Sequence, residues 1–371
     1  MDFDFNESQL MLQKTARDFF SKECPKNVIK EIASDDKGYP VELWNKMASL
    51  GWLGLVFPEK YGGTEGNFMD LAVILEEMGR VCLPGPFFST VILGGMLVLE
   101  AGNEAQKKSV LANIATGKAK VTLALSEPEQ IHFSEKITLE AKSKDNKYII
   151  NGVKLFVPYA HIADYIVCAA KTDEGPTLFL ADAKNPAISY TLLKTMDAEK
   201  LCEVAFKNAV FTKEQVLGTS GKGQAPLRNI IDKATVAKCA EMIGGAQRVL
   251  EMTIDHVKQR VQFGRPVGSF QAVQHHCANM LVLIDTSKLL TYKAAWKLSE
   301  GMSCGKEVAM AKAWVSQAFK RVTMLGHQCI GGVAFMEDHE LPLYSKRAKV
   351  YESAFGDTDY NREIVAKAMG L

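Results

Sequence analysis

The stretch QRVQFGRPVGSFQAVQHHCANM, residues 259–280, decides how the C-terminal part of this chain folds. A long helical pattern stops at FGRP, residues 263–266, because glycine and proline interrupt helices, and it resumes at Phe270. Arg260 offers a charged fork of donors that suits phosphate, and Phe263 offers an apolar face. The junction is therefore a candidate ligand site. The alternative is a sharp turn between helices that carries a surface arginine.

Helical periodicity surrounds this junction on both sides. From about residue 226 apolar residues recur at steps of three and four, as at Met242, Ala246 and Val249. The pattern predicts four long C-terminal helices, at about 226–262, 270–299, 306–329 and 359–370.

Two different segments precede these helices. Residues 1 to about 119 carry helical patterns, the first of which is started by Asn6 or Ser8. From about residue 120 apolar and polar residues alternate, and KDNK (144–147) and Asn151-Gly152 are typical of hairpin turns. The sequence therefore predicts an α+β fold with an N-terminal α-helical domain (1–119), a middle antiparallel β domain (120–225) and a C-terminal four-helix bundle domain (226–371).

Composition limits the classes of function. The 371 residues carry a formal net charge of +1, which gives no support for nucleic-acid binding. No apolar run reaches the roughly 20 residues of a membrane span, and the polar start MDFDFNESQL resembles neither a secretory signal nor a transit peptide. The eight scattered cysteines form no C-x-x-C pair, so we expect reduced thiols in a cytoplasmic protein.

Three further motifs carry weaker signals. Gly331-Gly332 ends a helix and exposes backbone groups that a ligand could approach, although a helix C-cap alone explains it equally well. A strand stops at Ser126 in LALSEPEQ. His275-His276 could suggest a metal, but adjacent helical residues point about 100° apart, so we expect no metal site.

Taken together, these segments resemble the acyl-CoA dehydrogenase family over essentially the whole chain. The resemblance rests on the α–β–α order and on ALSEP (124–128), INGVKLFVPYAHIAD (150–164), RVQFGRP (260–266) with FQ (270–271), QCIGG (328–332) and KRAK (346–349). It implies a tetramer with FAD between subunits that removes hydrogens from Cα and Cβ of an acyl-CoA. In this family a carboxylate takes the α-proton and flavin N5 takes the β-hydride. An electron-transfer flavoprotein would be the electron acceptor.

The resemblance also implies roles for individual residues. Arg260, Gln262 and Phe263 would contact the pyrophosphate and adenine region of a neighbouring subunit's FAD. The remaining cofactor contacts would be Gln328, Gly331 and Gly332 on the adenosine half, Gln271 nearby, and Ser126 beside the flavin ring.

The catalytic base of the family has no counterpart here. In most members the loop before the last helix reads Tyr-Glu-Gly-Thr, and its Glu is the base; this chain places Phe355 at that position. A second position for the base falls on Ala234. Glu352 lies nearly a helical turn before the loop and should point elsewhere. Asp357 is a weak candidate, because we expect it to cap the last helix or meet the flavin side chain.

The flavin side of the site departs from the family as well. The segment that normally donates a hydroxyl to flavin N5 reads Phe156-Val157-Pro158. The loop that normally wraps the FAD phosphates reads EQIHFSE (129–135), so Glu129 would bring negative charge to phosphate. The half that reaches into a neighbour's FAD looks retained, although GGVA (331–334) replaces the usual Gly-Gly-x-Gly.

Three hypotheses follow. In the first, the chain resembles the base-lacking subunit of heteromeric (α2β2) members, some of which act on steroid side-chain or ring-derived CoA esters, and it completes the FAD site of a second acyl-CoA dehydrogenase-like subunit. In the second, it is a homotetrameric enzyme with a non-standard base. In the third, it is a non-catalytic binding or scaffold homologue.

Overall fold

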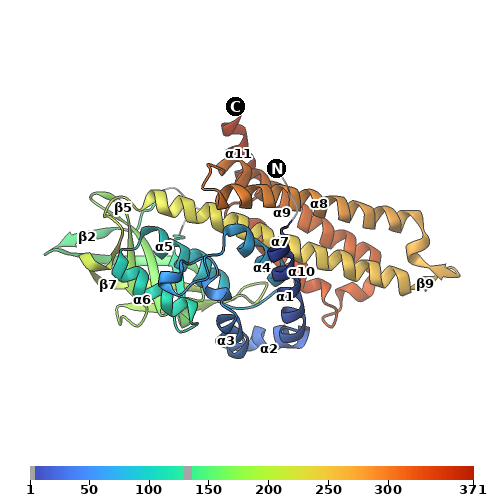
Figure 1. Ribbon diagram of the computed structural model, residues 1–371, viewed down its shortest axis with the longest axis horizontal. Helices are drawn as coiled ribbons and strands as arrows, with labels where there is room; N and C mark the ends of the chain where they lie inside the picture. The colour runs from blue at the N-terminus through green and yellow to red at the C-terminus, as the bar shows by residue number, and fades with distance from the viewer. Residues whose placement is uncertain (1–4, 129–135) are drawn as a thin grey trace. The chain divides into compact units, whose positions relative to one another are not determined.

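The computed structural model describes residues 5–128 and 136–371 (Figure 1). The chain separates into two compact units. The first is made of the described parts of residues 1–29, 68–83 and 235–371, and the second of 30–67 and 84–234.

The first unit is helical. Its helices are α1 (Glu7–Glu23), α4 (Phe68–Arg80), most of α7 (Gln224–Gln259), α8 (Gln271–Ser299), α9 (Gly305–Ile330), α10 (Leu341–Ser353) and α11 (Thr358–Ala368). Asn6 caps α1 through a reciprocal capping box with Gln9, as the sequence predicts. Four of these helices confirm the predicted C-terminal bundle, and α10 is added between α9 and α11.

The core of this unit joins α7 to the helices that follow it. Buried side chains of α7, α8, α9 and α10 form one cluster, represented by Met242, Ile284, Phe319 and Tyr344. The backbone of α4 approaches α7 so closely that a Cβ atom added to Gly244 would clash with the Glu76 carbonyl. These helices therefore share one packed core, and the loops at their ends extend from it.

The second unit contains two four-stranded sheets. One has the order β1 (Val121–Ala124), β4 (Tyr165–Thr172), β5 (Gly175–Asp182), β8 (Val216–Leu217), and the other β2 (Ala141–Lys144), β3 (Lys147–Pro158), β7 (Leu201–Thr212), β6 (Ile188–Leu193). All their pairings are antiparallel except β1 with β4, which is parallel. Buried residues of both sheets, among them Cys168, Phe179 and Phe211, share one core.

Helices accompany these sheets in the second unit. They are α3 (Val41–Ser49), a π-helix (Phe88–Gly95), α5 (Met96–Ala101) and α6 (Glu104–Ala115), and α2 (Lys26–Ser34) joins the two sets of residues. The α–β–α order predicted from the sequence is confirmed. No helix in the described part of the chain is long and apolar enough to cross a membrane.

Two local predictions need correction. The turn at KDNK is present, with Asp145 and Asn146 both left-handed between β2 and β3. Asn151-Gly152, however, is not a turn: β3 continues through it with a register shift against β7. Gly152 has φ of 147°, so the pair forms an irregularity inside strand β3. Asn-Gly is also typical of hairpin turns, which is why the sequence predicted a turn here. The first C-terminal helix also ends at Gln259 rather than at about 262.

Candidate functional site

A short hairpin occupies the junction after α7. The strands β9 (Val261–Gln262) and β10 (Arg265–Pro266) pair with each other, and the Val267 amide closes the hairpin by donating to the Arg260 carbonyl at 2.8 Å. Figure 1 shows β9 beyond the end of α7. Phe263 and Gly264 form the tip with φ of 51° and 78°. Sequence analysis expected a break in a helix here, and the structure adds the strand pairing.

Phe270 anchors the hairpin to the start of α8. The guanidinium of Arg265 lies over its ring at 4.2 Å, and Phe263 meets it edge to face with 6.0 Å between ring centroids. The Phe263 side chain is nevertheless 91% exposed. Arg260, Gln262 and Gln271 are exposed too, so this edge gathers hydrogen-bond donors beside an open aromatic face.

The end of α9 supplies the second group of predicted residues. Gly331 is the C-cap of α9, with φ of 79°, and its amide donates to the His327 carbonyl at 2.9 Å. A Cβ atom added at Gly331 or Gly332 would meet no other atom within 4 Å. The C-cap is confirmed, and space lies open outside both glycines. Gln328, in the last turn of α9, is exposed.

Sequence reasoning missed the contacts that hold the segment after Gly332. The ring of Phe335 stacks on His327 with 4.4 Å between centroids. His327 Nε2 lies 2.8 Å from Ser345 Oγ of α10. Burial and the nearby His339 lower the pKa of His327, which favours a neutral ring in this stack. Only the tertiary fold brings these three residues together, so no local sequence signal indicates them.

The residues expected beside the flavin lie in the β unit. Ser126 follows β1, is half-buried, and its carbonyl accepts from the Leu155 amide at 2.9 Å. Pro158 ends β3, and its carbonyl accepts from Thr122 Oγ1 at 2.6 Å. Phe156 has φ of 54° and a 59% exposed ring. The loop 129–135, with Glu129, lies outside the described residues.

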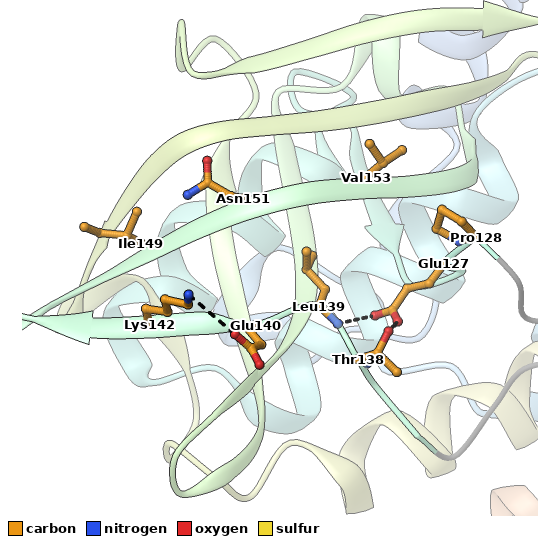
Figure 2. A pocket seen from close by; sticks show the side chains of 9 residues that line it. All are labelled: Glu127, Pro128, Thr138, Leu139, Glu140, Lys142, Ile149, Asn151 and Val153. Atoms are coloured by element: carbon orange, nitrogen blue, oxygen red, sulfur yellow. Dashed lines mark hydrogen bonds and ion pairs between the residues drawn. The ribbon is translucent and has the colours of Figure 1, made fainter.

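A pocket of about 470 Å³ opens beside Glu127 on the β2–β3 face (Figure 2). The Glu127 carboxylate points toward Thr138 and the Leu139 backbone, and Lys154 Nζ donates to it at 2.7 Å. Burial raises the pKa of Glu127, but the hydrogen bonds from Lys154 and Thr138 outweigh it, so the pKa falls overall. Glu127 is therefore an ionised structural group. Its hydrogen bonds connect the segment after β1 with Thr138, Leu139 and Lys154.

Neither Phe355 nor Ala234, the two residues predicted to stand at the base positions, carries a group that can accept a proton. Phe355 is buried with φ of 56°, and Ala234 is fully buried within α7. Glu352 accepts hydrogen bonds from Lys320 at 2.9 Å and Lys349 at 3.3 Å.

The two carboxylates near this loop, those of Glu352 and Asp357, already accept hydrogen bonds within the chain. Burial raises the pKa of Glu352, but Lys320 and Lys349 outweigh it and lower the pKa overall. Asp357 Oδ1 accepts from the Tyr360 amide at 2.9 Å, so Asp357 caps α11 as expected. A fully buried lysine, Lys312, also contacts this loop and was missed by the sequence analysis.

Sulfur and metal-ligating groups add no further site in the described residues. None of the eight cysteines, all of which lie in the described residues, forms a disulfide; six are buried and two half-buried. No group of three or more His, Cys, Asp or Glu side chains within 5–128 and 136–371 could hold a metal ion.

The fold and these segments define a class: a flavin-dependent oxidoreductase with helical, β and helical parts. Three family models match in order: acyl-CoA dehydrogenase N-terminal domain at 6–118, middle domain at 122–209 and C-terminal domain at 221–370. The chain belongs to the acyl-CoA dehydrogenase family, whose cofactor is FAD.

Individual relatives agree over nearly the full length. Cyclohex-1-ene-1-carbonyl-CoA dehydrogenase of Geobacter metallireducens is 30% identical over 98% of both chains. The caffeyl-CoA reductase-Etf complex subunit CarC of Acetobacterium woodii is 28% identical over 98% of both.

Solved structures are similar throughout as well. Butyryl-CoA dehydrogenase from Megasphaera elsdenii has a TM-score of 0.93 at 28% identity, with 100% of both chains covered. An FAD complex of PigA has a TM-score of 0.93 at 25% identity, also with 100% of both covered. The ChsE4-ChsE5 complex from Mycobacterium tuberculosis shares the fold, with a TM-score of 0.92 at 24% identity and coverage of 100% of this chain and 99% of that one.

The two units differ in how well their predicted cofactor residues suit FAD. In the helical unit the exposed Arg260 guanidinium, the open face of Phe263 and the space outside Gly331 suit a nucleotide cofactor. In the β unit Pro158, which was predicted to face flavin N5, has no N–H or hydroxyl to donate. The chemistry of the helical residues therefore suits a nucleotide, whereas Pro158 has no donor to offer a flavin ring.

Proposed function

We propose that this chain is the base-lacking subunit of a heteromeric acyl-CoA dehydrogenase. A second acyl-CoA dehydrogenase-like subunit would carry the catalytic Glu and most of the flavin contacts, and this chain would complete that subunit's FAD site. The complex would carry out α,β-dehydrogenation of an acyl-CoA thioester. The observation that supports the proposal most is the buried phenyl ring of Phe355, the residue predicted to stand at the family's base position.

The charges near Phe355 support this assignment. Removal of an α-proton needs a group that can accept it within hydrogen-bond reach. The ionised Glu352 carboxylate is paired with Lys320 and Lys349, and Asp357 uses Oδ1 to cap α11. When bound, FAD supplies the acceptor for the β-hydride, and under this proposal a base of the partner subunit would take the α-proton.

The exposed edge of the helical unit supports the second half of the proposal. Arg260, Gln262 and Phe263 would meet the pyrophosphate and adenine region of the partner's FAD. Gln328, Gly331 and Gly332 would meet its adenosine half, with Gln271 beside them. The 91% exposed ring of Phe263 and the nearby Arg260 guanidinium suit a flat, negatively charged ligand, and a shared cofactor site would use both.

Several finer features remain predictions. Ser126 would lie beside the flavin ring, on this chain's own side of the site, and an electron-transfer flavoprotein would accept the electrons; CarC is named as a subunit of a complex with Etf. The domain boundaries at 119–120 and 225–226 also stay predictions. A self-sufficient homotetramer with a non-standard base is the second candidate. Asp357, whose Oδ1 caps α11, is the weak candidate for that base.

Expression with and without a partner separates the two candidates. The chain is purified alone and together with an acyl-CoA dehydrogenase-like chain from the same organism that carries the catalytic Glu, and FAD is counted per chain. We expect no stoichiometric FAD and no turnover from this chain alone, and one FAD per two chains with activity in the complex. One FAD per chain with turnover in the protein purified alone would contradict the proposal.

A further inference from the structure

The side chain of Lys312 is fully buried beneath the loop that carries Phe355. Its ammonium, on α9, has three acceptors: the Glu352 carbonyl at 2.9 Å, the Gly356 carbonyl at 2.9 Å and Ser316 Oγ at 3.0 Å. An ammonium group has three N–H donors, so each donor is satisfied. All three acceptors are uncharged, and no salt bridge among the described residues includes Lys312.

This arrangement ties α9 to both ends of the loop. Glu352 lies near the end of α10, and Gly356 lies just before the α11 cap. Asn361 Nδ2 donates to the same Gly356 carbonyl at 3.1 Å and to the Asp357 carbonyl at 2.8 Å. The loop backbone is therefore held by two side chains that reach it from α9 and α11.

The charges facing Lys312 come from three further helices. Cys239 and Lys238 belong to α7, Glu352 to α10, and Asp357 precedes α11. Burial lowers the pKa of Lys312 to about 8 and Lys238 lowers it too, whereas the carboxylates of Asp357 and Glu352 raise it. Burial raises the pKa of Cys239 to about 12, so this residue is an uncharged thiol near pH 8. The Glu352 carboxylate is already bound by Lys320 and Lys349. Burial thus dominates, because no carboxylate hydrogen-bonds directly to the ammonium.

We propose that opening of the 353–357 loop is coupled to proton binding at Lys312. The closed loop keeps the ammonium away from water, whereas an open loop would hydrate it. A proton on Lys312 therefore favours the open loop, and loss of the proton favours the closed one. Lys312 is a positioning residue rather than a catalytic one, because its amine is enclosed and bound to backbone oxygens. The coupling does not depend on which subunit holds the flavin.

The sign of the pH dependence follows from linkage. The group titrates near pH 8 when the loop is closed and near its usual 10.5 when it is hydrated. The closed loop therefore binds fewer protons than the open loop between these values, so raising the pH stabilises the closed loop. Below pH 8 both forms hold the proton and the opening equilibrium does not change with pH.

Hydrogen exchange of the full-length protein tests the coupling. Protection factors, which remove the intrinsic pH dependence of exchange, are measured for amides 354–361 at pH 7 and pH 9 under conditions where opening is at equilibrium. We expect about a tenfold rise at pH 9 in the native protein. In Lys312→Met the rise should disappear.

Lys320→Met is the matched control, because Lys320 lies on the same helix and binds the Glu352 side chain but no loop carbonyl. It should retain the tenfold rise. A flat profile in the native protein overturns the proposal without any variant, even if Lys312→Met does not fold. A rise that persists in Lys312→Met, or one that Lys320→Met also removes, overturns it too.

Discussion

Phe263 rests its ring edge to face against Phe270, with 6.0 Å between centroids, while its side chain remains 91% exposed. One contact fixes the orientation of the ring and leaves most of its surface open. Such a residue contributes little to the core of its own chain and is suited to a flat partner outside it.

Replacing Phe263 by alanine should therefore separate folding from cofactor binding. We expect Phe263→Ala to change the free energy of unfolding by less than about 1 kcal/mol, because little area is buried. FAD affinity of the co-expressed complex should fall about tenfold, since an aromatic contact is lost. Urea unfolding and FAD titration measure the two effects, with exposed Met369→Ala as the control. A large loss of stability with unchanged FAD affinity would count against the assigned role.

A side chain at position 356 should destabilise the folded protein. It has φ of 88°, and an added Cβ atom would clash with the Tyr360 ring. We expect Gly356→Ala to lower the free energy of unfolding by roughly 2–4 kcal/mol, from the left-handed backbone and the clash together. Gly264→Ala is the matched control: φ is 78° there, but a Cβ atom would meet nothing within 4 Å, so only about 1 kcal/mol should be lost. Equal losses in the two variants would show that the Tyr360 contact is unimportant.

Restoring a carboxylate at position 355 should not create a self-sufficient enzyme. Phe355→Glu places an acid at the position predicted for the family's base, but Pro158, predicted to face flavin N5, still has no donor. We expect no turnover of short, branched or cyclic acyl-CoA thioesters by the variant expressed alone. Dye-linked assays measure it, with native protein as control. Robust turnover would show that this chain's own flavin side is competent.

The buried Lys312 predicts how global stability depends on pH. Its pKa lies near 8 in the folded chain and near 10.5 in the unfolded chain, so the unfolded chain binds more protons between these values. The native protein should gain up to about 3 kcal/mol relative to Lys312→Met as the pH rises from 8 to 10.5. Urea unfolding of both proteins at matched pH values gives this difference, in which other titrating groups cancel. A difference that falls with pH would contradict the sign.

The elements that sequence analysis predicted correctly are those with local causes. Asn6 caps α1, Asp145 and Asn146 turn a hairpin, and Gly331 ends α9, because a single residue or a neighbour a few positions away decides each. The α2 helix and the π-helix at Phe88–Gly95 were missed. No capping or turn residue was found in the sequence that marks where either of them begins or ends.

Errors and omissions arose where distant residues decide the outcome. Asn151-Gly152 has turn composition, but strand pairing with β7 keeps it extended. Lys312 is one of three lysines in α9, and nothing nearby in the sequence indicates that it reaches carbonyls some 40 residues further on, at Glu352 and Gly356. The exposed hairpin contacts were anticipated only as residue types, because the Arg265–Phe270 contact depends on how the hairpin folds back.

The central claim is that this chain completes a partner's FAD site, and FAD retention by the co-expressed complex tests it most directly. Arg260→Ala removes a charge-assisted contact of the kind that is worth roughly 2–5 kcal/mol at an interface. We predict that the complex then loses FAD, whereas a bulky replacement of Ser126, such as Ser126→Trp, has much less effect. Retention of FAD and activity in Arg260→Ala, with loss of both in the Ser126 variant, would contradict the account and show that this chain holds its own flavin.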